Sequence, residues 1–451
     1  MGDSICRVGC ATGFSGDRAD GALPLVRTLV ARGGGTLIFE TLAERTLALA
    51  QLARDENPAL GYESQLDDLI SPVLSECLSH SIPIIGNFGA ANPPAAAARI
   101  RELARQQGLP APRVAVVTGD RLESAEQWAV LRERLGAKLD RADVVSANAY
   151  IGAMDIADAL RAGAQVVVTG RVADPSLTLA PAIAHHGWSQ HDWARLGRAS
   201  IAGHLLECGA QVSGGYFAIP GLKDVPDLHA VGMPIAEIDR DGGFVVGKAD
   251  NTGGQVTSRT VKEQLLYEVH DPARYLTPDV IADLSAASVQ EMGADRVAVH
   301  GVTGHRRPEE LKVNVCYRGG WLVEASISYA GLQAEARARL AADIVRKRLA
   351  GVLPLRVDLI GAVSILGDDE GRRLAREPDR HREDVRLRVA AVHPDRRTAS
   401  QVGREVLSLY TCGPAGGGGV RTTLRPRLNM LSCTIPRGQV PTGWYWQEEV
   451  A

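Results

Sequence analysis

Short apolar runs alternate with amphipathic stretches from the N-terminus to about residue 190. Near-continuous runs such as IPIIGN and RVAVVTGD are typical of strands that are buried on both faces of a sheet. The stretches between them favour helices, and PPAAAARIRELARQQG begins with Pro and ends with Gly, as helices often do. This order predicts an α/β fold in which flanking helices cover a parallel sheet.

The pattern changes beyond about residue 230, where strand-like runs follow one another with turn signals between them. The run LKVNVCYRGGWLVEASISYAG is predicted to be a hairpin that turns at Arg318, Gly319 and Gly320. We therefore expect two domains. Residues 1–230 form a parallel α/β domain that carries the main polar site, and residues 231–451 form an α+β domain with antiparallel strands and a Gly-rich loop at 413–419.

Composition argues against several classes of protein, namely those that bind nucleic acid, span a membrane or are secreted. The chain of 451 residues has 45% hydrophobic and 23% charged residues and a net charge of -3, so it lacks the basic character typical of nucleic-acid binding. Its apolar runs are shorter than the roughly 20 residues of a membrane-spanning helix, and no signal peptide is evident. Seven scattered cysteines favour a reducing compartment. We expect a cytoplasmic protein that binds neither nucleic acid nor membrane and forms a homo-oligomer.

Polar side chains follow each predicted strand of the first domain. In open parallel sheets, ligands bind in the crevice outside the carboxyl ends of the strands. Helix capping explains Asn92 and Ser176 equally well, but a helix start disfavours a cation such as Arg171. The convergence therefore predicts a polar site, whose candidates are Ser15, Asp17, Arg18, Glu40, Asn87, Asn92, Asn148, Arg171, Asp174 and Ser176.

These residue types suggest acid–base chemistry on an anionic substrate. Arg171, with Arg18, is expected to hold a carboxylate or to stabilise an enolate-like oxyanion. Asn87 and Asn148 are expected to orient the substrate. The general base is expected among three carboxylates, Asp17, Asp174 and Glu40.

A second candidate lies in GHLLECGAQVSGGYF. His204 and Glu207 are three residues apart and share one face of a predicted helix. The pair could carry out acid–base chemistry or bind a divalent metal, or it could be an ordinary pair on a helix surface. The adjacent Cys208 is expected to be a buried, unreactive thiol rather than a nucleophile.

A third candidate is the Gly-rich stretch YTCGPAGGGGVR. Its backbone amides and the arginine that follows could bind a phosphate of coenzyme A or of a nucleotide. A flexible loop or tight turn explains the glycines equally well. The residues concerned are Gly416, Gly417, Gly418, Gly419 and Arg421.

Taken together, GCATGFSGDRADGAL, NFGAANP, SANAYIGA, TGRVADPSL, GHLLECGAQVSGGYF and GPAGGGGVR strongly resemble the acyclic terpene utilisation AtuA family. The similarity extends from about residue 6 to the C-terminus. The resemblance implies a place in acyl-CoA or carboxylic-acid metabolism, with a small acyl or carboxylate substrate. It leaves open whether a coenzyme A thioester is the substrate and whether a divalent metal is bound.

We expect an enzyme of the hydratase or lyase type. One alternative is a non-catalytic subunit that binds an acyl-CoA or a nucleotide for a partner enzyme. Another is a thioester or amide hydrolase, although the sequence has no G-x-S-x-G nucleophile motif.

Overall fold

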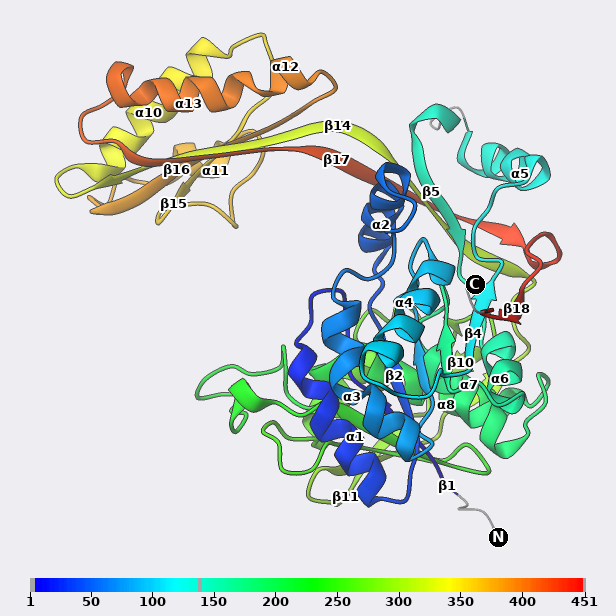
Figure 1. Cartoon of the computed structure of the whole chain (residues 1–451). Coiled ribbons are helices and arrows are strands. Elements are labelled where there is room, and N and C mark those ends of the chain that lie inside the picture. The colour runs from blue at the N-terminus through cyan, green and yellow to red at the C-terminus, as the bar shows by residue number, and fades with distance from the viewer. Residues whose placement is uncertain (1–4, 137–139, 449–451) are drawn as a thin grey trace. The chain divides into compact units, whose positions relative to one another are not determined.

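The computed structural model describes residues 5–136 and 140–448, which divide into two compact units (Figure 1). The chain up to Cys316 and from Met430 onward forms the first unit, and Tyr317–Asn429 form the second. The boundary predicted between residues 230 and 231 does not coincide with this division. The reason is that two strands beyond that boundary, β7 (Pro234–Asp239) and β8 (Phe244–Lys248), hydrogen-bond into the main sheet of the first unit.

The main sheet of the first unit has the strand order β11-β12-β8-β7-β1-β2-β3-β6-β4-β18. Its central strands run parallel to one another, as predicted. They are β1 (Ile5–Cys10), β2 (Thr36–Phe39), β3 (Ile84–Gly86), β6 (Val166–Val168) and β4 (Val114–Thr118). The α/β fold class is therefore confirmed.

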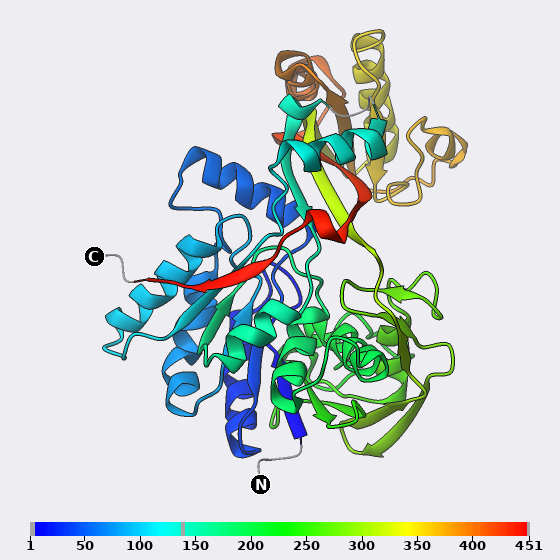
Figure 2. The same ribbon diagram turned by 90° about the vertical axis from the view of Figure 1, so that its right-hand side faces the viewer.

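Antiparallel strands extend this parallel centre at both edges. On one side the extension consists of β7, β8, β12 (Arg296–His300) and β11 (Ser288–Gly293). On the other side, β18 (Gly443–Trp446) pairs with β4, so the C-terminal end of the chain lies beside a strand from its first half (Figure 2).

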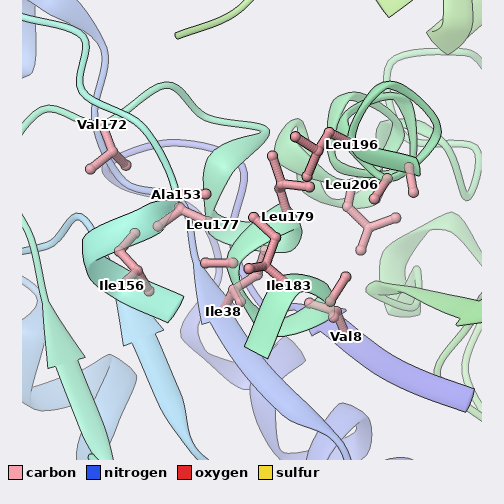
Figure 3. Packing of buried hydrophobic residues seen from close by; sticks show 14 of the residues in the cluster. Val8, Ile38, Ala153, Ile156, Val172, Leu177, Leu179, Ile183, Leu196 and Leu206 are labelled. Atoms are coloured by element: carbon pink, nitrogen blue, oxygen red, sulfur yellow. The ribbon is translucent and has the colours of Figure 1, made fainter. Parts of the chain in front are cut away.

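Alternate residues of the central strands face two hydrophobic cores, which is why the sheet is buried on both sides. Leu37 and Phe39 of β2 face the first core, and Ile38 between them faces the second core. Leu177 and Leu206 pack in the second core with Ile38 (Figure 3). The helices of the first core are α1 (Ala22–Ala31), α3 (Leu66–Ser79) and α4 (Pro93–Gln106). Those of the second are α5 (Ala125–Leu135), α6 (Met154–Arg161), α7 (Ser176–His186), α8 (Trp193–Glu207) and α9 (Ser258–Leu266).

Two sequence interpretations are corrected. The segment expected to be a fifth strand of the parallel sheet is a strand, β5 (Val144–Ala149), but it pairs with β14 (Glu310–Ala330) outside that sheet. Its first half is only partly buried, whereas β2, β3 and β6 are buried throughout. The predicted hairpin at Arg318–Gly320 is instead continuous within β14. Gly320 has a φ of 81°, so the strand can kink there without turning back.

The second unit is an antiparallel sheet covered on one face by helices. Its strand order is β15-β16-β14-β17, with β15 (Arg356–Ile360), β16 (Asp384–His393) and β17 (Gly418–Pro436). The helices α10 (Ala334–Arg348) and α13 (Gln401–Cys412) pack on it through a core that includes Ile327, Leu387 and Val402 (Figure 1). Two short helices complete this unit, α11 (Arg372–Arg376) and α12 (Arg396–Ala399).

The remaining elements of the first unit lie around the main sheet. They are α2 (Glu44–Glu56) and a small sheet of β13 (Thr303–His305), β10 (Ile281–Asp283) and β9 (Tyr275–Leu276). None of the helices in the described part of the chain is long and apolar enough to cross a membrane.

Candidate active site

A cavity of about 620 Å³ opens at the carboxyl ends of β1, β2 and β6, within the first unit. This is the edge at which parallel α/β sheets bind ligands. Carboxylates outnumber cations in its wall. The charged residues that line it are Asp17, Glu40, Glu44, Arg171, Asp174, Glu207, Glu268 and Lys312.

Arg171 is the largest fully buried side chain at this edge, with 1% of its surface exposed. Its Nε donates to the carbonyl of Val172 at 2.8 Å and its Nη1 to the carbonyl of Leu42 at 2.7 Å. Its Nη2 donates to the Val172 carbonyl and to Asp174 Oδ1. Burial alone would lower the pKa of Arg171, but Asp174 and the neighbouring acids outweigh that effect and raise it. The guanidinium is thus a fixed positive charge that joins the loops after β2 and β6, and most of its donors are already used.

Asp120 and Asn148 hold the backbone of this loop rather than a substrate. Asp120 Oδ2 accepts from the backbone N–H of Arg171 at 2.9 Å and from Asn148 Nδ2 at 2.9 Å. A Cβ on Gly170 would lie 2.7 Å from Asp120 Oδ2, so only glycine fits there. The substrate-orienting role predicted for Asn148 is therefore better described as positioning of Arg171.

Glu40 lies beneath the cavity and is only 4% exposed. Its Oε1 accepts from the backbone N–H of Leu42 at 3.0 Å, and its Oε2 accepts from Asn87 Nδ2. Burial raises the pKa of Glu40 well above its usual range, and the negative charge of Asp174 adds to this, while Arg171 and Asn87 oppose it. Glu40 therefore favours its protonated form, and Asn87 acts as its hydrogen-bond partner.

Glu44 lines the same cavity, but its surroundings shift its pKa in the opposite direction. Its Oε1 accepts from the Tyr150 hydroxyl at 2.6 Å and lies 3.4 Å from Lys312 Nζ. Burial alone would raise the pKa of Glu44, but the hydrogen bond from Tyr150 and the charges of Lys312 and Arg171 outweigh it and lower the pKa. Glu44 therefore favours its ionised form.

Tyr150, Glu44 and Lys312 also line the cavity, although none of them is among the candidate site residues predicted from the sequence. The Arg171 guanidinium lies 4.7 Å and the Lys312 ammonium 4.5 Å from the centre of the Tyr150 ring. Tyr150 stands directly after a strand, which was a usable signal. Lys312 had no such signal, because it lies far away in the sequence, on β14, which pairs with β5; Tyr150 N–H donates to the Lys312 carbonyl at 2.9 Å.

His204 and Glu207 form a buried pair at another wall. His204 Nδ1 lies 2.9 Å from Glu207 Oε1 and 3.3 Å from the Tyr275 hydroxyl. Within the described chain, His204 Nε2 and Glu207 Oε2 have no hydrogen-bond partner. Burial raises the pKa of Glu207, whereas for His204 burial is outweighed by Glu207, which raises its pKa. The pair is suited to exchanging a proton.

The metal-binding interpretation of this pair gains no support. Among residues 5–136 and 140–448, no three His, Cys, Asp or Glu side chains come together in an arrangement that could hold a metal ion. Cys208 also lines the cavity, and burial raises the pKa of its thiol, which makes it a poor nucleophile.

Besides Asn87 and Asn148, four of the predicted strand-end residues do not line the cavity. Arg18 is partly exposed, and its guanidinium is engaged by Asp20 and by the carbonyl of His229. Ser15 is half-buried in the same loop. Asn92 Nδ2 donates to the carbonyls of Pro58 and Leu60.

Ser176 is also engaged elsewhere, because its hydroxyl donates to Asp279 Oδ2 at 2.7 Å. Asp17 does line the cavity, but its carboxylate accepts from the backbone N–H groups of Gly13 and Arg18. Its position suits holding the loop rather than acting as a base.

The Gly-rich stretch belongs to the second unit. It follows the C-terminus of α13 and leads into β17, with Gly416 at a φ of 73°. A helix C-terminus presents carbonyl groups and a partial negative charge, which disfavours phosphate. Gly417, Gly418, Gly419 and Arg421 thus form a helix-to-strand turn and the start of a strand, and the phosphate-binding interpretation gains no support.

The fold and the cavity define an α/β protein with buried carboxyl groups gathered around one arginine at the ends of parallel strands. Within that class, the chain belongs to the acyclic terpene utilisation AtuA family, whose model matches residues 6–446. The resemblance seen in the sequence motifs is thereby confirmed. No curated protein and no solved structure gives a significant match.

The raised pKa of Glu40 predicts a pH dependence of stability. A carboxyl that binds its proton more tightly in the folded state makes stability fall as pH rises from the ordinary carboxyl range towards the folded pKa. Glu40→Gln should therefore reduce the fall in unfolding free energy between about pH 5 and 8, by up to about 1.4 kcal/mol per pH unit. Urea unfolding at a series of pH values measures this slope.

Glu44→Gln is the matched control. The lowered pKa of Glu44 contributes stability that is lost only as pH falls below the ordinary carboxyl range, so this variant should keep the wild-type slope above about pH 5. Equal slopes for wild type and Glu40→Gln would contradict the protonated state of Glu40.

Proposed function

We propose that the protein is a hydratase or lyase that acts on a small carboxylic acid or its acyl thioester in this cavity. The observation that supports this most is the opposite pKa shifts of Glu40 and Glu44, two carboxyl groups that face the same space. Pairs of titratable groups held in opposite protonation states are how one site supplies both an acid and a base.

In the hydration direction, ionised Glu44 takes a proton from water, whose oxygen adds to the β-carbon of an unsaturated acyl group. Protonated Glu40 gives its proton to the α-carbon, and the reverse sequence eliminates water. Lys312 is half-exposed at the cavity and can contact the acyl oxygen, where negative charge develops. Glu207, backed by His204, is a second proton carrier at the opposite wall.

An adjoining cavity supports an acyl substrate. This second cavity, of about 430 Å³, shares Tyr150 and Lys312 with the first. Its wall is largely apolar and includes Leu276, Ile281 and Leu311. A ligand with its reactive group between Glu40 and Glu44 could therefore place a hydrocarbon chain here, with a favourable contribution from burial of apolar surface.

A hydrolase with a covalent intermediate has less support. The Cys208 thiol has a raised pKa, and the Ser176 hydroxyl is committed to Asp279 away from the cavity. A non-catalytic acyl-CoA-binding subunit would use the same cavity, and the experiment below separates it from an enzyme.

The first test is turnover with a panel of short 2-enoyl and 3-hydroxyacyl thioesters of coenzyme A and the corresponding free acids. In D₂O the protein alone should incorporate deuterium at the α-carbon. Glu40→Gln and Glu44→Gln should each lower kcat by about 10²-fold or more, because each removes one proton-transfer group. Glu56→Gln, an exposed carboxylate at the end of the same helix as Glu44, should leave kcat unchanged. Binding of thioesters without turnover or exchange would favour the binding subunit instead.

The second test concerns the acyl chain. Leu276 is 60% exposed and lines the apolar cavity, so Leu276→Asp should fold normally but weaken binding of the chain. The KM for thioesters with longer chains should rise about tenfold, with little change for the shortest ones. Leu266→Asp, at a residue that is equally exposed but lies outside both cavities, is the control. An equal rise in KM for all chain lengths would place the chain elsewhere.

A further inference from the structure

The two compact units carry opposite net charge. Residues 317–429 contain 20 Lys and Arg against 13 Asp and Glu, a net charge of +7. The rest of the chain contains 30 Lys and Arg against 40 Asp and Glu, a net charge of -10. The overall charge of -3 therefore conceals a strongly basic unit and a strongly acidic one.

In the sheet of the second unit, alternate residues of β17 point to opposite faces. Val420 and Leu424 pack against the helix-covered core. A Cβ on Gly403 of α13 would lie 2.7 Å from Thr422, so Thr422 also faces the helices. The intervening residues Arg421 and Arg425 therefore point to the face without helices, and Arg427 follows at the same period.

The neighbouring strands continue this open face. Ser328 of β14 and Arg386 of β16 are register partners on it, and Arg386 Nε donates to Ser328 Oγ at 3.0 Å. Towards β15 the arginines are neutralised, since Arg388 pairs with Glu324 and Asp358. The positive charge is left uncompensated on the β17 side.

Arg421, Arg425 and Arg427 are all exposed, and within the described residues none of them forms an ion pair or a side-chain hydrogen bond. We call these three residues the arginine face. Three unpaired guanidinium groups on one sheet surface form a site for a partner that carries several carboxylates, because Arg binds carboxylates through two parallel hydrogen bonds.

We propose that the arginine face docks on the acidic first unit of a second copy of this chain. The charges of the two units are complementary, and complementary charge steers association and fixes its register. The positions of Tyr329 and Trp321 in this sheet do not favour single-stranded nucleic acid as the occupant. Tyr329 and Trp321 pack on the helix side, so the open face has no ring from these residues on which a base could stack.

The contact is made through the face rather than through the edge of β17. Pro426 lies within this edge strand and lacks an N–H, and arginines flank it. Both features discourage addition of another strand. Self-association thus depends on side-chain charge and is independent of the acid–base chemistry proposed for the cavity.

Light scattering after size-exclusion chromatography tests the proposal with the full-length protein. At low ionic strength the wild type should form a dimer or a larger assembly, and about 0.5 M salt should weaken it because the charges are then screened. The combined variant Arg421→Glu, Arg425→Glu and Arg427→Glu should raise the dissociation constant at least about tenfold.

The matched control reverses three exposed cations on the helices of the same unit, Lys347→Glu, Arg397→Glu and Arg404→Glu. It changes the net charge equally and should keep the wild-type assembly, with thermal unfolding confirming that both variants are folded. A wild type that stays monomeric at low salt would overturn the proposal. So would loss of assembly in both variants, or binding of single-stranded RNA at the arginine face.

Discussion

The buried guanidinium of Arg171 is the interaction on which the site depends. An unpaired charge in a protein interior is so unfavourable that it must be surrounded by acceptors. Here those acceptors are the carbonyls of Leu42 and Val172 and the carboxylate of Asp174, which belong to the loops after two different strands. Satisfying one cation therefore fixes the two loops that form the cavity wall.

The same cation determines the protonation states around it. Glu40, Glu44 and Asp174 all lie near Arg171, and a single buried positive charge cannot keep several buried carboxylates ionised. Glu44 retains its charge because Tyr150 and Lys312 also stabilise it. The hydrogen-bond donors to Glu40, the Leu42 N–H and the Asn87 amide, are both neutral. Burial therefore has the largest effect on the pKa of Glu40 and favours its protonated form. The pKa values of Glu40 and Glu44 are therefore shifted in opposite directions although the two carboxyl groups line the same cavity.

The sequence predicted which strand ends meet at the cavity better than it predicted the contacts that each side chain makes. The period of buried strands placed Glu40, Arg171 and Asp174 at one sheet edge, because the carboxyl ends of parallel strands coincide. It could not distinguish Arg171 from Arg18, since both follow strands and only the loop conformation turns one inward and the other to the surface. Lys312 escaped notice because it enters through pairing between segments that are far apart in the chain.

The fold shows the same division between local and long-range information. The alternation of Val and Ile runs with helices predicted the parallel sheet and its two covered faces. Strand pairing was not encoded locally, so β5 was assigned to the wrong sheet and the Gly319–Gly320 kink in β14 was taken for a turn. Glycine pairs permit both conformations, and only the partner strands of β14 select the extended one.

The most direct test of the account is the protonation state of Glu40. Infrared spectroscopy resolves the C=O stretch of a protonated carboxyl group from the bands of ionised carboxylates. The raised pKa of Glu40 predicts a protonated carboxyl band at neutral pH whose intensity falls in Glu40→Gln and is unchanged in Glu44→Gln. A wild-type spectrum in which the band is absent at neutral pH, or a band unchanged in Glu40→Gln, would contradict it.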